Sequence, residues 1–143
     1  MSEQLYYFED MQEGMEASFS KTVTEADIVQ FAGVTGDFNP VHVNAEFAAT
    51  TMFKQRIAHG MLSAGFISTV LGMRLPGPGC IYVSQSLRFR APVFIGDTVT
   101  ARVKVTGLKP ERNMVTLETV CSVGDKEVIT GEAVVMVPRR EQA

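Results

Sequence analysis

The chain has 143 residues, of which 45% are hydrophobic and 20% charged, so we expect one folded domain over residues 1–143 and exclude a disordered chain. Its net charge is −3 and it contains no run of Lys or Arg, which argues against a nucleic-acid partner or a basic membrane-binding surface. No segment has the apolar core of a signal peptide or the length to span a bilayer comfortably. We therefore expect a cytoplasmic protein without membrane contact.

The two cysteines, Cys80 and Cys121, lack the spacing of a CxxC redox motif or of a metal site. Cys121 falls on the apolar side of an alternating run, which indicates a buried thiol. No other cluster in the sequence suggests a metal or a cofactor, so we expect neither.

The first half of the chain has helical patterns. Thr24 followed by Asp27 predicts a helix N-terminus with an acidic partner in its first turn. The segment 36–40 ends this helix, because its proline disfavours helix at the preceding residue. Asn44 predicts the cap of a second short helix over residues 45–50.

A third helix is predicted over residues 60–75, where it meets a Pro-Gly-Pro-Gly stop. The helix is apolar nearly all round, and such a helix is usually buried on every face. The apolar residues are Met61, Leu62, Ala64, Phe66, Ile67, Val70 and Leu71.

The hydrophobic period becomes two after residue 80, which predicts β-strands. They cover about residues 81–90, 98–106, 115–123 and 127–137, and a further strand lies within Glu16–Val23. In the first of them Ile81, Val83, Leu87 and Phe89 form the apolar side. Helices followed by antiparallel strands predict an α+β domain in which one sheet curls around the apolar helix.

Asp37 and His42 lie five residues apart across a proline-stiffened turn. A carboxylate and an imidazole can hold one water molecule between an anion and a neutral base, and such a pair can transfer protons. Asn39 offers a donor and an acceptor that can orient either partner or a substrate carbonyl. The residues alone also fit a structural interpretation, in which Asp37 caps a turn and His42 packs beside it.

The start of the third helix is a second candidate element. Gly60 presents an unshielded backbone N–H that, with the helix dipole, can stabilise an oxyanion, although the glycine alone also fits close packing. We expect His59 to be buried and hydrogen-bonded in a structural role. Ser68 lies about two helical turns further and roughly shares the face of Gly60, but a serine on a buried helix usually bonds its own backbone.

The segment from Phe31 to Ala48 resembles the signature of the MaoC-type dehydratases, in which Gly-Asp-x-Asn-Pro-x-His is followed six residues later by a small residue. The resemblance continues in order through residues 49–51, 58–61, 75–77, 85–87 and 131–135. The chain is similar in particular to the R-specific enoyl-CoA hydratases that consist of a single hot-dog domain.

This resemblance implies a role for each matching residue. Asp37 and His42 would be the acid/base pair that holds the catalytic water, and Asn39 would support their loop. Gly60 would donate its N–H to the thioester oxygen, and Ser68 falls where the family has a serine near the site. The implied fold is a long helix wrapped by an antiparallel sheet, in a homodimer whose protomers pair edge to edge. The implied substrate is an acyl-CoA thioester, with no metal or redox cofactor.

Three other functions remain open. Acyl-CoA thioesterases also use hot-dog folds, and fold does not fix function, although they usually lack the Asn-Pro-x-His loop. A non-catalytic acyl-CoA-binding module would tolerate loss of Asp37 or His42, and both are present. A dehydratase that acts on acyl carrier protein would need a basic rim. Candidates for such a rim or for CoA phosphates, and equally for a solvated strand face, are Arg88, Arg90, Arg102 and Lys104.

Overall fold

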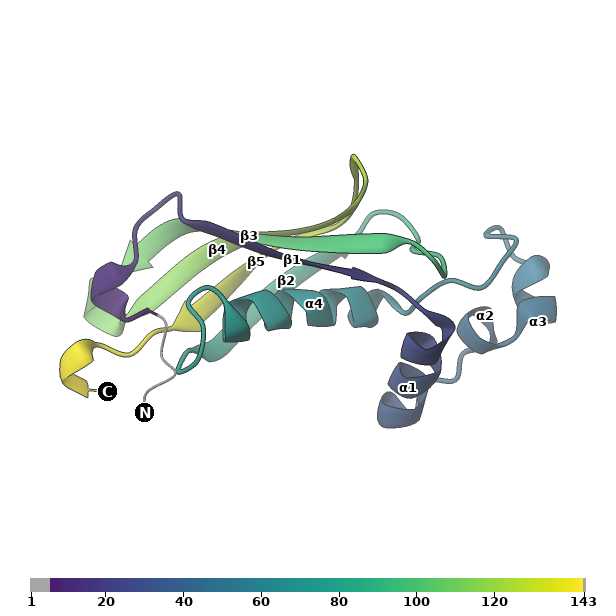
Figure 1. The fold of residues 1–143 in the computed structure, drawn as a ribbon, viewed down its shortest axis with the longest axis horizontal. Helices are drawn as coiled ribbons and strands as arrows, with labels where there is room; N and C mark the ends of the chain where they lie inside the picture. Colours follow the sequence, from purple (N-terminus) through teal and green to yellow (C-terminus); the bar gives the residue numbers. More distant parts are fainter. Residues whose placement is uncertain (1–5, 143) are drawn as a thin grey trace.

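A five-stranded antiparallel sheet curls over one side of a long helix, α4 (Gly60–Met73), in the computed structural model, which describes residues 6–142 (Figure 1). The strand order is β1-β3-β4-β5-β2, so β1 and β2 form the two edges of the sheet. Three short helices, α1 to α3, project beyond the N-terminal end of α4, and the C-terminal segment lies toward its other end (Figure 1). This arrangement is the hot-dog fold that the sequence led us to expect.

The elements follow one another without long insertions. The strands are β1 (Glu16–Thr22), β2 (Ile81–Phe89), β3 (Thr98–Lys109), β4 (Met114–Val123) and β5 (Lys126–Met136). The helices before α4 are α1 (Glu25–Thr35), α2 (Pro40–Val43) and α3 (Ala45–Ala49). Short 3-10 helices cover Phe8–Asp10, Pro110–Arg112 and Arg140–Gln142. No helix in the described range is long and apolar enough to cross a membrane.

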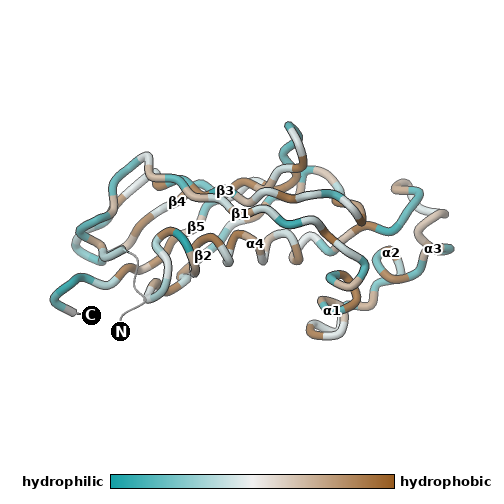
Figure 2. Tube along the Cα trace, viewed as in Figure 1, coloured by the Kyte–Doolittle hydropathy of each residue, from teal (hydrophilic) through white to brown (hydrophobic). Residues whose placement is uncertain are grey.

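The hydrophobic core lies between α4 and the concave face of the sheet. The buried residues of α4 are Ser63 and the apolar residues Ala64, Phe66, Ile67, Val70 and Leu71. The strands contribute the expected alternating residues, all buried, which are Val99, Ala101, Val103, Val105, Val115, Leu117 and Cys121. Figure 2 shows hydrophobic residues along α4 and the strands, with hydrophilic stretches at the C-terminal segment. The predicted period of two in β3 and β4 is therefore confirmed.

The prediction that α4 is buried on every face is wrong for the single chain. Met61 and Met73 expose 55% and 65% of their surface, and Ser68 is exposed between them. The physical reason is that the sheet covers only one side of the helix (Figure 1). The opposite face of α4, which carries Met61, Ser68 and Met73, is therefore uncovered.

Strand β2 also differs from the prediction. Ile81, Val83 and Phe89 were expected on the buried side, but they are 60%, 47% and 53% exposed. The strand pairs with β5 on one side only, and its register shifts between Tyr82 and Ser84. Because β2 is an edge strand, its apolar residues have few neighbours and stay exposed. An alternating sequence pattern does not show whether a strand lies at the edge of a sheet.

The helices that precede α4 in the chain have caps that the sequence predicted, at Thr24 and Asn44. The side chain of Thr24 accepts a hydrogen bond from the backbone N–H of Asp27, and the Asp27 carboxylate accepts one from the backbone N–H of Thr24, which is a capping box. Gly36 ends α1 with φ at +82°, a conformation that favours glycine. Asn44 caps α3 as predicted. The single turn α2 was not predicted; its proline stands in the first turn, where it is tolerated.

Candidate active site

The loop between α1 and α2 is held by short side chains that bond its own backbone. The Asp37 carboxylate accepts a hydrogen bond from the Asn39 backbone N–H at 3.2 Å. The Asn39 side chain accepts one from the Val41 N–H at 3.2 Å and so caps α2. Asn39 thus supports the turn of helix that carries His42, while the Asp37 side chain remains exposed.

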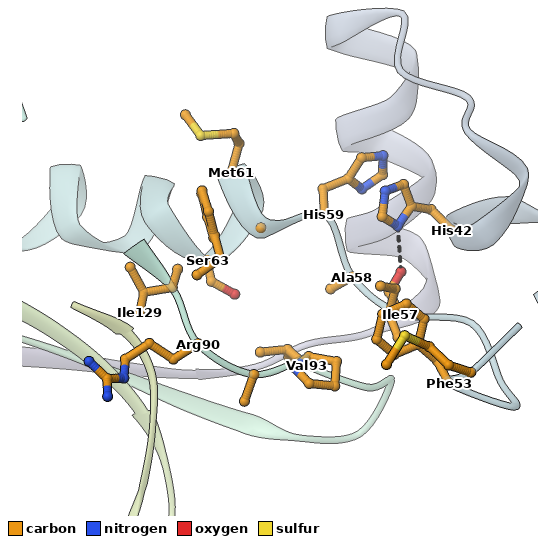
Figure 3. A pocket seen from close by; sticks show the side chains of 15 residues that line it. His42, Phe53, Ile57, Ala58, His59, Met61, Ser63, Arg90, Val93 and Ile129 are labelled. Carbon is orange, nitrogen blue, oxygen red and sulfur yellow. Dashed lines mark hydrogen bonds between the residues drawn. The ribbon is translucent and has the colours of Figure 1, made fainter. Parts of the chain in front are cut away.

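His42 is fixed in one tautomer. Its Nδ1 lies 2.8 Å from the carbonyl oxygen of Ile57, and because a carbonyl only accepts, Nδ1 carries the hydrogen (Figure 3). The Nε2 of the neutral ring then has a free lone pair. Burial lowers the pKa of His42 and outweighs the opposing effect of the Ile57 hydrogen bond; nearby His59 lowers this pKa further and Asp37 raises it. His42 is therefore kept neutral and can act as a base.

Arg56 connects this region to its surroundings. Its Nε donates to the backbone carbonyl of His42 at 2.7 Å, and its guanidinium forms an ion pair with Glu25 on α1 at 2.6 Å. The Arg56 side chain is only 14% exposed. These contacts anchor the short helix α2 to α1 and to the segment that leads into α4.

His59 is buried and hydrogen-bonded, as expected, and it also contacts both members of the predicted pair. Its Nε2 donates to the backbone carbonyl of Asp37 at 2.9 Å, and its ring stacks on that of His42 with centroids 3.9 Å apart. Phe31 contacts the ring of His59 at 4.7 Å. Since Nε2 carries the hydrogen, Nδ1 of a neutral His59 bears a lone pair, and this buried atom has no partner among the described residues.

The polar atoms of these residues converge. One carboxylate oxygen of Asp37 and one ring nitrogen each of His42 and His59 lie within 4.8 Å of one another. A single water molecule with hydrogen bonds of about 2.8 Å on each side can bridge such a gap. The same three groups could supply ligands to a metal ion, but the two stacked rings are inclined by only 29°, so their in-plane lone pairs do not converge well on one ion.

Gly60 is the first residue of α4 and directly follows His59, and it lines the same cavity as His42. A Cβ atom at Gly60 would lie 2.5 Å from the Phe89 ring, so the glycine permits a close contact with β2. A cavity of about 540 Å³ begins here (Figure 3). Its lining includes His42, Gly60, Ser63, Phe53, Val93 and Ile129. The cavity is largely apolar and is open at the positive end of the α4 dipole.

Ser68 does not line this cavity. It faces a second hollow of about 440 Å³ between α4 and β2, together with Tyr82 and Gln85. Met61 lines both hollows. The structure therefore brings Asp37, Asn39, His42 and Gly60 to one end of α4 and places Ser68 on its outer face.

Sequence reasoning singles out neither Arg56 nor Ser63. Arg56 is 14 residues from the carbonyl that it binds, and no periodic pattern marks such a contact. Ser63 lies three residues after Gly60, and this helical spacing is the one signal that could have found it.

Comparisons with known proteins agree with this geometry. A family model described as a MaoC like domain matches residues 8–128. An (R)-specific enoyl-CoA hydratase from Rhodospirillum rubrum is 66% identical, over 95% of this chain and 94% of that protein. A 3-hydroxybutyryl-CoA dehydratase from Methylorubrum extorquens is 53% identical, over 96% of this chain and 87% of that protein.

The fold is shared with a solved structure of known activity. The (R)-hydratase from Aeromonas caviae superposes with a TM-score of 0.88 at 46% identity, covering 90% of this chain and 98% of that chain. The matched family region includes the loop from Asp37 to His42 and the start of α4. The chain belongs to the MaoC-like domain family.

Proposed function

We propose that the protein is an R-specific enoyl-CoA hydratase, which adds water reversibly to a trans-2-enoyl-CoA and gives an (R)-3-hydroxyacyl-CoA. The observation that carries the proposal is the exposed carboxylate of Asp37 close to the neutral imidazole of His42, at the mouth of an apolar cavity. Relatives named hydratase or dehydratase at 66% and 53% identity support a coenzyme A thioester as the substrate.

In the proposed reaction Asp37 and His42 hold the attacking water between them. The water oxygen bonds to C3 of the enoyl group, a water proton passes to the pair, and C2 takes up a proton from it. The free Nε2 lone pair of His42 suits this role because the Ile57 carbonyl fixes the other ring nitrogen. Asn39 keeps α2, and with it His42, in position.

Attack at C3 moves negative charge onto the thioester oxygen. We assign its stabilisation to the backbone N–H of Gly60, at the positive end of α4. One such donor is worth roughly 3 kcal/mol in the transition state. Ser68 would contact the substrate at a distance from the acid/base pair, in the hollow between α4 and β2.

The second part of the proposal is a homodimer that forms across the β2 edge. Strand β2 has a hydrogen-bonding partner only on the β5 side, and its exposed residues include Ile81 and Val83. An exposed apolar edge favours pairing with another strand, and a second copy of the chain supplies one. The uncovered face of α4, with Met61 and Met73, adds apolar surface that association can bury. Light scattering at micromolar concentration should give twice the monomer mass, and a monomer would contradict this proposal.

We further propose that residues 1–143 act as one domain in the cytoplasm. One hydrophobic cluster joins α4 to the sheet and supports the single domain. Cys80 and Cys121 are both unpaired, and burial raises the pKa of the Cys121 thiol to about 12. Unpaired, unreactive thiols suit a reducing compartment.

Hydration of crotonyl-CoA tests the function directly. The enoyl-thioester absorbance should fall, and the product should be oxidised by an R-specific but not by an S-specific 3-hydroxyacyl-CoA dehydrogenase. A thiol reagent added in parallel detects free coenzyme A. A product consumed only by the S-specific enzyme would overturn the stereochemical assignment, and thiol release without hydration would identify a thioesterase instead.

A further inference from the structure

Ser63 on α4 has a buried hydroxyl with no hydrogen-bond partner. Four polar residues are buried in the described part of the chain, and they are His42, His59, Ser63 and Thr119. The two histidines bond backbone carbonyls, and Thr119 accepts a hydrogen bond from Gln85 at 2.9 Å. Ser63 is 1% exposed, and its Oγ contacts no donor or acceptor in the described residues. It does not even bond the preceding turn of its own helix, which is the usual solution for a buried helical serine.

An unpartnered hydroxyl in a core destabilises the folded protein, because the group leaves water without gaining a hydrogen bond. An alanine would avoid this cost, and Ala64 follows directly on the same helix. The hydroxyl is therefore explained best by a ligand that supplies the missing partner.

The position of Ser63 indicates which ligand atom that is. Residues three apart on a helix are neighbours on one face, and a helical side chain leans toward the N-terminus. Ser63 is one turn after Gly60, and both line the cavity of about 540 Å³ that His42 also lines. In Figure 3 the Ser63 hydroxyl points into this cavity, whose lining is mostly apolar, as at Ile129 and Val93, and also includes Arg90.

We propose that Ser63 is a further catalytic residue, whose hydroxyl donates a hydrogen bond to the thioester carbonyl oxygen alongside the backbone N–H of Gly60. This inference rests on the proposed hydratase function. The two donors approach the oxygen from the first turn of α4, and both bonds strengthen as negative charge develops on it during attack at C3. Ser68, which faces the other hollow, does not reach this oxygen.

The test is the Ser63→Ala enzyme, assayed for hydration of crotonyl-CoA beside the wild type. Because the hydrogen bond strengthens in the transition state, kcat should fall by about 10²-fold with little change in KM. The melting temperature should stay the same or rise, since an unsatisfied buried group is removed. Ser63→Cys, which keeps the volume and a weak donor, should have a kcat between those of the wild type and Ser63→Ala.

Ser20→Ala is the matched control. It deletes a serine hydroxyl on β1 that does have a partner, Thr100 at 2.7 Å, so a small loss of stability with unchanged kcat is expected. The proposal is overturned if Ser63→Ala keeps more than half of the wild-type kcat, or if its kcat and melting temperature fall together as a packing defect would cause. A wild-type enzyme that does not hydrate crotonyl-CoA at all would instead refute the proposed function.

Discussion

Two regions of the molecule, the sheet with α4 and the segment from α1 to the start of α4, are held in place by different kinds of contact. The sheet and α4 are held by apolar side chains, among them Val103 and Leu117, which are fully buried. The segment from α1 to the start of α4 has few fully buried residues, among them Ile28 and Ala32. It is fixed instead by bonds from side chains to backbone carbonyls, such as those that His42 and His59 donate.

This difference separates stability from activity. Loss of a buried side chain in the sheet should cost free energy of unfolding and leave the chemistry unchanged in the molecules that stay folded. Loss of a polar contact around α2 should move the proposed acid/base pair while the core remains intact.

The largest effect is expected at the pair itself. Asp37→Asn and His42→Gln should each lower kcat by at least ~10²-fold, the scale of a positioned acid/base group. Both changes keep volume and hydrogen-bonding capacity, so the melting temperature should move little. The double variant should be barely worse than the worse single one, because the two groups act on one water. If either single variant keeps more than about a tenth of the wild-type kcat, that residue is not part of the pair.

Leu117→Ala should show the opposite behaviour. Leu117 is fully buried on β4, and removal of such a side chain typically lowers the free energy of unfolding by about 2–5 kcal/mol. Urea unfolding followed by circular dichroism measures this loss, and kcat per folded molecule should stay at the wild-type value. Glu118→Ala, on the exposed face of the same strand, is the control and should change stability by less than about 0.5 kcal/mol. A tenfold loss of kcat in Leu117→Ala would break the proposed separation.

Two helix caps give a matched comparison within the site region. Asn39→Ala removes the cap of α2, and Asn44→Ala removes the equivalent cap of α3. Each should lower stability by about 1 kcal/mol. Only Asn39→Ala should lower kcat, severalfold, because α2 carries His42 and α3 carries none of the proposed catalytic residues. Equal losses of kcat in the two variants would show that the cap of α2 has no special relation to the site.

The smallest effect concerns pH. The pKa of His42 lies below its ordinary value of 6.5 in the folded protein, mainly because of burial. Below pH 6.5 the unfolded chain binds a proton more readily than the folded one, so stability should decline as pH falls from 6.5 toward the lower folded pKa. The acid limb of kcat/KM, which reports groups of the free enzyme, should likewise have its midpoint below 6.5. His42→Gln should flatten the decline in stability, and a variant with the same decline would assign the effect to another group.

The fold could be predicted largely from the sequence because burial on one face leaves a periodic pattern. Alternation in β3 and β4 predicted their buried residues, and the Pro-Gly-Pro-Gly segment predicted the end of α4 to within two residues. The exposed side of α4 and the open edge at β2 could not be predicted in this way. A pattern of apolar residues does not say whether the same chain or another covers them.

The proposed site could be predicted only in part. The motif around Asp37 and His42 is local, and its capping by Asn39 follows from residue types. The bond from Arg56 to the His42 carbonyl and the stack of His59 on His42 depend on the path of the backbone between α3 and α4. Such contacts leave no periodic signal. Ser63 looks like any small residue until its missing partner is seen in three dimensions.

The stacked imidazoles give the protein a built-in spectroscopic probe. The chain contains two histidines in all, and both lie in this stack. Their opposite tautomers, with hydrogen on Nδ1 in His42 and on Nε2 in His59, have distinct nitrogen chemical shifts. The imidazole ¹⁵N signals of the wild-type protein therefore come from this stack alone. A pH titration can follow the protonation of the two rings beside Asp37 without a substitution that introduces a reporter residue.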